Sequence, residues 1–277
     1  MEDSKPGAMS HEYMRPRGPE PGGNESRRRF IDRRVNPPSP TLLVSTKESA
    51  SLMPSYLSGG GRMPQLEAVV FDNNGTMLDD LSVAYGSVEA IFSVLNLLCP
   101  TRDQYREEIG SKFMEFYRRH GVTEHITAEQ LNVIRKLYYG AHMNQAHFRP
   151  DLVPALHHCS RLGLRLAVCS AEIRSVLKSF LDRDGIAWHF DVIRAEAWPK
   201  GEALRGVVDA MGMKPERAAY VDDTEDGIIS AREAGLRTIA FAHPTGYNSA
   251  ERLRNQKPDY VVNDFGELRS LLSGLTI

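Results

Sequence analysis

A short apolar run, Ala68 to Phe71, stops abruptly at an aspartate, Asp72. The length of the run and its valine content predict a buried strand rather than a helix. A carboxylate at the carboxyl end of a buried parallel strand lies where open α/β sheets bind their ligands. Asp72 could act there as a covalent nucleophile or as a metal ligand. An ordinary aspartate that caps the following helix is the alternative.

Two adjacent carboxylates, Asp222 and Asp223, follow a second predicted strand over residues 217–221. They would repel each other unless a cation lies between them and Asp72. Hard oxygen ligands of this kind suit Mg²⁺, which keeps several waters and takes one or two carboxylates together with phosphate oxygens. The pattern therefore predicts a magnesium site, with a solvated acidic turn as the alternative.

The residues around Asp72 resemble a known catalytic motif. Residues 71–76, Phe-Asp-Asn-Asn-Gly-Thr, are similar to motif I of the haloacid dehalogenase superfamily, whose members are mostly phosphatases that work through an aspartyl-phosphate. The resemblance covers about residues 66–273 and points to phosphoglycolate phosphatase-like members with a small helical cap. Three later stretches resemble the other family motifs in the right order: Val168-Cys169-Ser170-Ala171, Trp198-Pro199-Lys200-Gly201 and Tyr220-Val221-Asp222-Asp223-Thr224-Glu225-Asp226-Gly227-Ile228.

The resemblance implies a role for each motif residue. Asp72 would be the nucleophile, Lys200 would neutralise it and the transferring phosphoryl group, and Ser170 with the following amides would hold a phosphoryl oxygen at a helix N-terminus. The implied catalytic set is Asp72, Asn74, Ser170 and Lys200, the substrate-binding set is Asn73, Thr76, Ser170, Ala171 and Lys200, and the ligands of the Mg²⁺ cofactor are Asp72, the backbone carbonyl of Asn74, Asp222 and Asp223.

Asn74 departs from the family pattern, which has a second aspartate at this position. In family phosphatases that aspartate protonates the leaving oxygen and then activates water, and an amide can do neither. General acid–base help is typically worth ~10²–10⁴ in rate. Restoring the carboxyl group by Asn74→Asp is therefore expected to speed the hydrolysis of alkyl phosphates. If it does not, His142, His147 or a hydroxyl of the substrate becomes the candidate for the missing acid.

The departure at Asn74 leaves several functions open. The first is a Mg²⁺-dependent hydrolase of a small-molecule phosphate monoester. The second is a phosphonatase-type C–P hydrolase, which would need Lys112 or Lys136 of the predicted cap as a Schiff base. The third is a catalytically weak phosphate-binding protein of the same superfamily. Dehalogenation is disfavoured, because family dehalogenases lack the paired carboxylates seen at Asp222 and Asp223.

The order of predicted elements indicates how these residues are positioned. From residue 151 onward, helix and strand signals alternate, which predicts an α/β fold with a doubly wound, Rossmann-like parallel sheet. Helical periodicity over residues 81–149 predicts an inserted helical block, with one amphipathic helix at 105–117. This block resembles the small helical cap that one large branch of the superfamily carries after motif I. The expected organisation is a disordered extension at 1–62, a core formed by 63–80 and 150–277, and the cap.

The composition of the chain limits the classes of partner that it could bind. The formal net charge of −2 gives no electrostatic argument for nucleic acid, and no apolar run approaches the roughly 20 residues of a membrane span. Three scattered cysteines, Cys99, Cys159 and Cys169, suggest a reduced, cytoplasmic protein. The expected partner is a small phosphorylated metabolite. The sequence leaves the oligomeric state open.

Overall fold

The computed structural model describes residues 65–110 and 112–276. The predicted disordered extension at 1–62 lies outside the described residues. No helix within the described ranges is long and apolar enough to cross a membrane.

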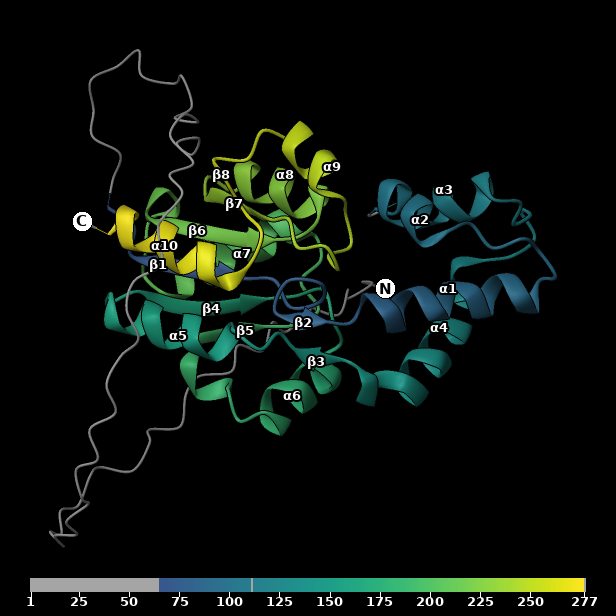
Figure 1. The fold of residues 1–277 in the computed structure, drawn as a ribbon, viewed down its shortest axis with the longest axis horizontal. Helices are drawn as coiled ribbons and strands as arrows, with labels where there is room; N and C mark the ends of the chain where they lie inside the picture. Colours follow the sequence, from purple (N-terminus) through teal and green to yellow (C-terminus); the bar gives the residue numbers. More distant parts are fainter. Residues whose placement is uncertain (1–64, 111, 277) are drawn as a thin grey trace, which may run out of the picture. The chain divides into compact units, whose positions relative to one another are not determined.

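A six-stranded parallel sheet forms the centre of the fold (Figure 1). β1 (Ala68–Phe71) pairs with β4 (Arg165–Cys169) on one side and with β6 (Ala218–Asp222) on the other. The register brings the carboxyl ends of these three strands level, so the residues that follow them meet at one edge of the sheet. The full order is β5 (Val192–Arg194), β4, β1, β6, β7 (Arg237–Phe241) and β8 (Tyr260–Val262).

Side chains of β1 alternate between two apolar layers, as the two-residue period of a strand requires. Val69 and Phe71 join one layer, and Ala68 and Val70 join the other. Both faces of the sheet are therefore covered, which explains why β1 is apolar at every position. The first layer contains α5 (Leu152–Arg161), α6 (Arg174–Arg183) and α10 (Phe265–Leu275). The second layer contains α7 (Lys200–Ala210) and α8 (Glu225–Glu233). Helix α9 (Ala250–Asn255) packs beside α8.

Among the described residues, four α-helices lie between β2 (Leu78–Asp79) and β3 (His147–Phe148), which pair as a small antiparallel ribbon. Two of these helices begin at capping boxes, in which the hydroxyls of Thr101 and Thr127 accept a backbone hydrogen bond from three residues on. The four helices bury an apolar cluster of their own around Phe116. They are α1 (Leu81–Val94), α2 (Arg102–Glu108), α3 (Phe113–Arg119) and α4 (Ala128–His142).

The predicted fold class, a doubly wound α/β sheet with an inserted helical cap, is confirmed. The boundaries proposed for core and cap stay predictions. The single helix predicted over 105–117 is wrong, because α2 ends at Glu108 and α3 begins only at Phe113. Ile109 has an extended backbone there, and Gly110, a poor helix former, follows it.

Helix α5 offers a direct test of this packing. Leu156 is fully buried against the sheet, whereas Val153 of the same helix is 38% exposed. Leu156→Ala should lower the free energy of unfolding by about 2–5 kcal/mol, the usual cost of a core truncation. Val153→Ala, the control, should change it by less than about 0.5 kcal/mol. Urea denaturation measures both, and equal effects would contradict the assigned core.

Candidate active site

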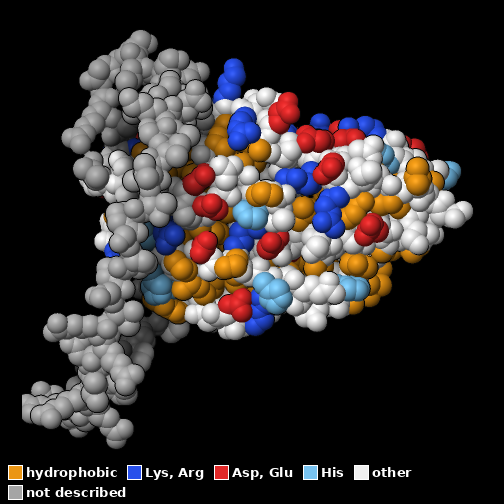
Figure 2. Space-filling view, viewed as in Figure 1, with side chains coloured by type: hydrophobic (Ala, Val, Ile, Leu, Met, Phe, Trp, Pro, Cys, Tyr) orange, Lys and Arg blue, Asp and Glu red, His pale blue; other side chains and the backbone are white. Residues whose placement is uncertain are grey.

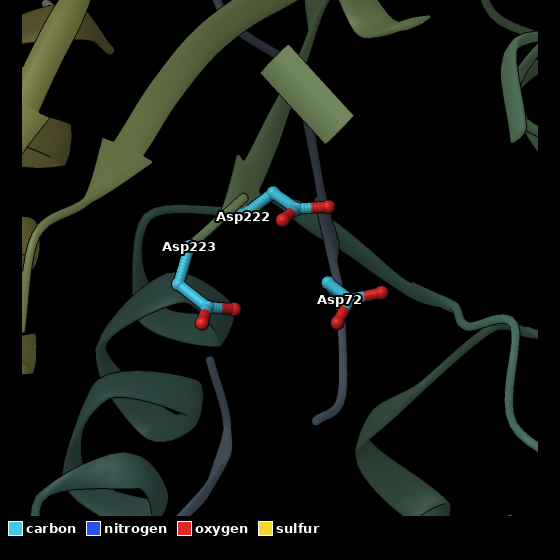
Figure 3. Close-up of side chains that lie close together, drawn as sticks. All are labelled: Asp72, Asp222 and Asp223. Carbon is cyan, nitrogen blue, oxygen red and sulfur yellow. The ribbon is translucent and has the colours of Figure 1, made fainter. Parts of the chain in front are cut away.

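Three carboxylates from neighbouring strand ends lie together (Figure 3). Asp72 directly follows β1, Asp222 is the last residue of β6, and Asp223 comes next. All three are buried, and one oxygen from each lies within 4.8 Å of the others. The parallel pairing of β1 with β6 therefore builds the cluster that the sequence predicted.

Burial and mutual repulsion make this cluster electrostatically unfavourable. Burial, followed by the charge of Asp72, raises the pKa of Asp222 to about 6. Burial and the charge of Asp222 raise the pKa of Asp223 well above its ordinary value. Both effects disfavour the ionised carboxylates, and a divalent cation between them would reverse that. Buried hard oxygen donors of this kind suit a divalent cation such as Mg²⁺ in their chemistry.

Lys200 supplies positive charge at the edge of the cluster. Its Nζ lies 2.7 Å from Asp72 Oδ1, 3.2 Å from the Cys169 carbonyl and 3.0 Å from the Tyr220 hydroxyl. Burial alone would lower the pKa of Lys200, but the charges of Asp72 and Asp222 raise it above its ordinary value. Lys200 is the first residue of α7. Its ammonium group is therefore a fixed positive charge in contact with the candidate nucleophile, Asp72.

Motif I approaches Asp223 very closely. Gly75 has a φ of +79°, and a Cβ built on it would lie 2.1 Å from Asp223 Oδ2. Thr76 is buried, donates to Asp223 Oδ1 at 2.8 Å and accepts from the Asp223 amide at 3.1 Å. The structure thus places Thr76, which the resemblance assigned to substrate, on a candidate metal ligand.

Ser170 lies at the end of β4, next to β1, and no hydrogen bond in the described structure joins it to Asp72. Its hydroxyl accepts from the Glu172 amide at 3.1 Å, and Ala171 is exposed. The expectation of a helix N-terminus at Ser170 is wrong, because α6 begins at Arg174. Hydroxyl and amides of this loop would have to bind an anion without a helix terminus.

The side-chain amide of Asn74 faces two carboxylates. Its Nδ2 lies 2.8 Å from Asp80 Oδ2, 3.3 Å from Glu172 Oε2 and 3.2 Å from the Tyr139 hydroxyl. Carboxylate oxygens only accept, so these neighbours fix the amide with its nitrogen toward them. The amide oxygen of Asn74 accepts from Asn73 Nδ2 at 3.0 Å, and the Asn73 side chain is itself fully buried.

Asp80 is a fully buried carboxylate held by four donors. Gly75 donates its backbone N–H to Oδ1 at 2.9 Å. Oδ2 accepts from Asn74 and from the hydroxyls of Tyr139 at 2.8 Å and Tyr247 at 3.0 Å. Burial raises the pKa of Asp80 to about 6, although all four hydrogen bonds favour the ionised form. Asp80 is thus a further buried acid beside motif I, in addition to the three carboxylates of the cluster.

Arg149 holds the turn of motif I in place. It follows β3, so it comes after the inserted helices in the sequence. Its buried guanidinium donates to the carbonyls of Gly75 at 2.6 Å and Thr76 at 2.9 Å. It also donates to the Thr245 hydroxyl at 2.8 Å and lies 3.3 Å from an oxygen of Asp79. The turn that carries Asn74 is therefore rigidly supported.

Several of these residues were missed at the sequence level: Asp80, Tyr139, Arg149, Glu172, Tyr220 and Tyr247. Asp80 has the sequence signal of a helix cap, and it does stand at the N-cap of α1, but its carboxylate makes no capping bond. Tyr139 comes from a helix some 60 residues further along the chain. Only the folded chain brings such residues together.

The cap histidines suggested as substitutes for the missing acid make no described contact with the site. His142 Nδ1 lies 2.8 Å from the Tyr138 carbonyl, and its ring stacks on that of Tyr138. His147 is exposed on β3. Neither observation supports an acid–base role for these residues.

The fold and the site define the class of protein: a doubly wound α/β core with a buried carboxylate cluster and a fixed lysine at the carboxyl edge of its parallel sheet. The family model described as haloacid dehalogenase-like hydrolase matches residues 69–241. The chain belongs to this family, and the expectation of an enzyme of its phosphatase type is confirmed.

Relatives of known name are distant but cover most of the chain. A phosphoglycolate phosphatase of Vibrio parahaemolyticus is 21% identical, over 75% of this chain and 96% of its own length. Phosphoglycolate phosphatase 1 of Pseudomonas aeruginosa is 24% identical, over 75% of this chain and 79% of its own length. The similarity thus includes the inserted helices as well as the sheet.

Solved structures show the same fold. A haloacid dehalogenase-like family protein from Streptococcus pneumoniae has a TM-score of 0.66 at 20% identity, and covers 74% of this chain and 98% of its own. A family hydrolase from Deinococcus radiodurans, solved with bound phosphate and sodium, has a TM-score of 0.61 at 17% identity, and covers 76% of this chain and 96% of its own.

The buried acid Asp80 predicts a specific pH dependence of stability. The unfolded chain loses this proton near pH 3.8 and the folded protein near pH 6. Between these values the unfolded state binds fewer protons, so the wild type should lose stability relative to Asp80→Asn as the pH rises. The expected relative loss is about 2–3 kcal/mol, at about 1.4 kcal/mol for each pKa unit.

Chemical denaturation at several pH values between 4 and 7, in the presence of a chelator, measures this difference. A gap between wild type and Asp80→Asn that stays constant over that range would contradict the raised pKa.

Proposed function

We propose that this enzyme is a Mg²⁺-dependent hydrolase of a small-molecule phosphate monoester, acting through an aspartyl-phosphate on Asp72. The observation that carries the proposal is the pairing of Asp72 with Lys200 at 2.7 Å inside a cluster of three buried carboxylates. The names of the phosphoglycolate phosphatase relatives favour a small phosphorylated acid as substrate. The phosphate bound to the Deinococcus radiodurans neighbour favours a phosphate site in this fold.

In the proposed reaction, Asp72 attacks phosphorus while the ester P–O bond breaks, and water later cleaves the aspartyl-phosphate. Lys200 and Tyr220 both contact Oδ1 of Asp72, which fixes the rotation of the carboxylate and leaves Oδ2 to form the bond to phosphorus. Asp72, Asp222 and Asp223 would hold Mg²⁺, which supplies positive charge to the phosphoryl oxygens when bound. Lys200 stabilises the same developing charge.

The inserted helices would serve as the cap that excludes water and selects the substrate. On the face shown in Figure 2, acidic and basic side chains are interspersed, without a broad patch of one sign. That surface suits a small metabolite better than a nucleic acid. We propose the cytoplasm as the location, on the cysteine usage alone.

The phosphonatase alternative is disfavoured by the positions of the cap lysines. Lys112 is 80% exposed and pairs with Glu115, and Lys136 is also exposed. A Schiff-base lysine instead needs a lowered pKa, which burial or a neighbouring cation provides. The remaining alternative is a catalytically weak phosphate-binding protein. It is motivated by Asn74, whose amide cannot act as the general acid and base.

An assay of phosphate esters with Mg²⁺ or with chelator separates these functions. Wild type should turn over repeatedly with Mg²⁺ and lose activity with chelator. Asp72→Asn, which keeps the shape of the side chain, should reduce turnover to background because the nucleophile is gone. Undiminished turnover with chelator would refute the metal role. Phosphate binding without turnover would favour the weak-binding alternative.

The choice of leaving group gives a further prediction. Because Asn74 cannot donate a proton in the first step, aryl and acyl phosphates should be hydrolysed faster than alkyl phosphates, by about the 10²–10⁴ that acid–base catalysis supplies. A series of esters with graded leaving-group pKa measures the slope. A flat series would show that another group protonates the leaving oxygen.

A further inference from the structure

Tyr139 joins the inserted helices to the loop that follows the nucleophile. It lies on α4, and its hydroxyl donates to Asp80 Oδ2 at 2.8 Å and accepts from Asn74 Nδ2 at 3.2 Å. Because Asn74 Nδ2 also donates to Asp80 Oδ2, the three side chains form a closed triangle of hydrogen bonds. The phenol takes part in two of its three sides.

Tyr247 extends this triangle to the metal cluster. Its hydroxyl lies 3.0 Å from Asp80 Oδ2, and its backbone N–H donates to the carboxylate of Asp223. Its ring packs against Tyr105 of α2, at 6.5 Å between centroids. Asp80 is thus the point where the inserted helices, motif I and a candidate metal ligand are linked by direct contacts.

Position 74 must carry a donor for this triangle to exist. Asp80 and Glu172 both present carboxylate oxygens to the amide nitrogen, at 2.8 and 3.3 Å. A carboxylate at position 74 would be the third negative group in this small volume, and like charges at such distances repel strongly. This reverses the expectation from the sequence alone, that Asn74→Asp simply restores an acid.

We propose that Asn74 and Asp80 form the docking site for Tyr139, so that the amide at position 74 latches helix α4 onto the motif I loop instead of transferring a proton. Tyr139 is then a positioning residue that holds the loop beside Asp72 while the cap is docked. The kinetic consequence rests on the proposed function, but the latch itself does not, since it is a property of the protein without substrate.

Hydrogen–deuterium exchange of peptides covering residues 72–80 and 135–143 tests the latch directly. The Gly75 amide is a built-in reporter, because it is hydrogen-bonded to Asp80 Oδ1. Tyr139→Phe should speed exchange in both peptides about tenfold or more, the size expected for a lost hydrogen bond to a charged group. Tyr138→Phe is the matched control, because the Tyr138 phenol lies against Gly86 and not against Asp80. The exchange rates of this variant should match those of the wild type. Equal exchange in the two variants would overturn the proposal.

Exchanging the amide and the carboxylate provides a second test. Asn74→Asp should lose protection in the same peptides, and the double variant Asn74→Asp with Asp80→Asn should regain much of it, because one amide–carboxylate pair is restored in the reverse order. Partial rather than full recovery is expected, since Glu172 remains near position 74. A double variant no better protected than Asn74→Asp would contradict the pairing.

The same variants separate the latch from the proposed reaction. If the wild type hydrolyses phosphate esters, Asn74→Asp should lower kcat/KM about tenfold, mainly through kcat, and an increase would overturn the latch. If the wild type hydrolyses no ester, the proposed function fails, and the exchange measurements still decide whether the latch exists.

Discussion

The repulsion among three buried carboxylates is the constraint on which the rest of this structure depends. Asp72, Asp222 and Asp223 hold oxygens within 4.8 Å of one another in a volume with little access to water. Uncompensated, such a cluster favours protonation, as the raised pKa values of Asp222 and Asp223 indicate. Lys200 balances part of the charge. A bound cation would balance the negative charge that Lys200 leaves uncompensated. The same cation would therefore both stabilise the site and take part in its chemistry.

The polypeptide around the cluster is arranged to keep these charges in place. Gly75 and Gly227 let backbone approach the carboxylates more closely than any side chain would allow. Arg149 fixes the carbonyls of the motif I turn. A further acid, Asp80, lies buried behind that turn, and donors from the loops after β1 and β7 and from α4 converge on it. The position of α4 and the geometry of motif I are therefore not independent.

The sequence was sufficient to predict the sheet and the cluster, because both depend on local signals. Apolar runs that end in Asp72 and in Asp222 mark strand ends, and parallel pairing brings strand ends together. The break between α2 and α3 was missed, since it depends on an extended Ile109 within an amphipathic pattern. The surroundings of Asn74 were missed for another reason. Tyr139 and Glu172 reach it from distant parts of the chain, and only tertiary structure reveals that an amide there meets carboxylates.

We propose that Asp72 takes the phosphoryl group beside Lys200 and the two carboxylates at the carboxyl end of β6, Asp222 and Asp223. The most direct measurement is acid quenching during turnover of an aryl phosphate with Mg²⁺, followed by mass spectrometry of the proteolysed chain. We expect a phosphoryl adduct on the peptide that contains Asp72, and no adduct in the Asp72→Asn variant. An adduct on any other residue, or turnover without an adduct under conditions that trap aspartyl-phosphates, would contradict it.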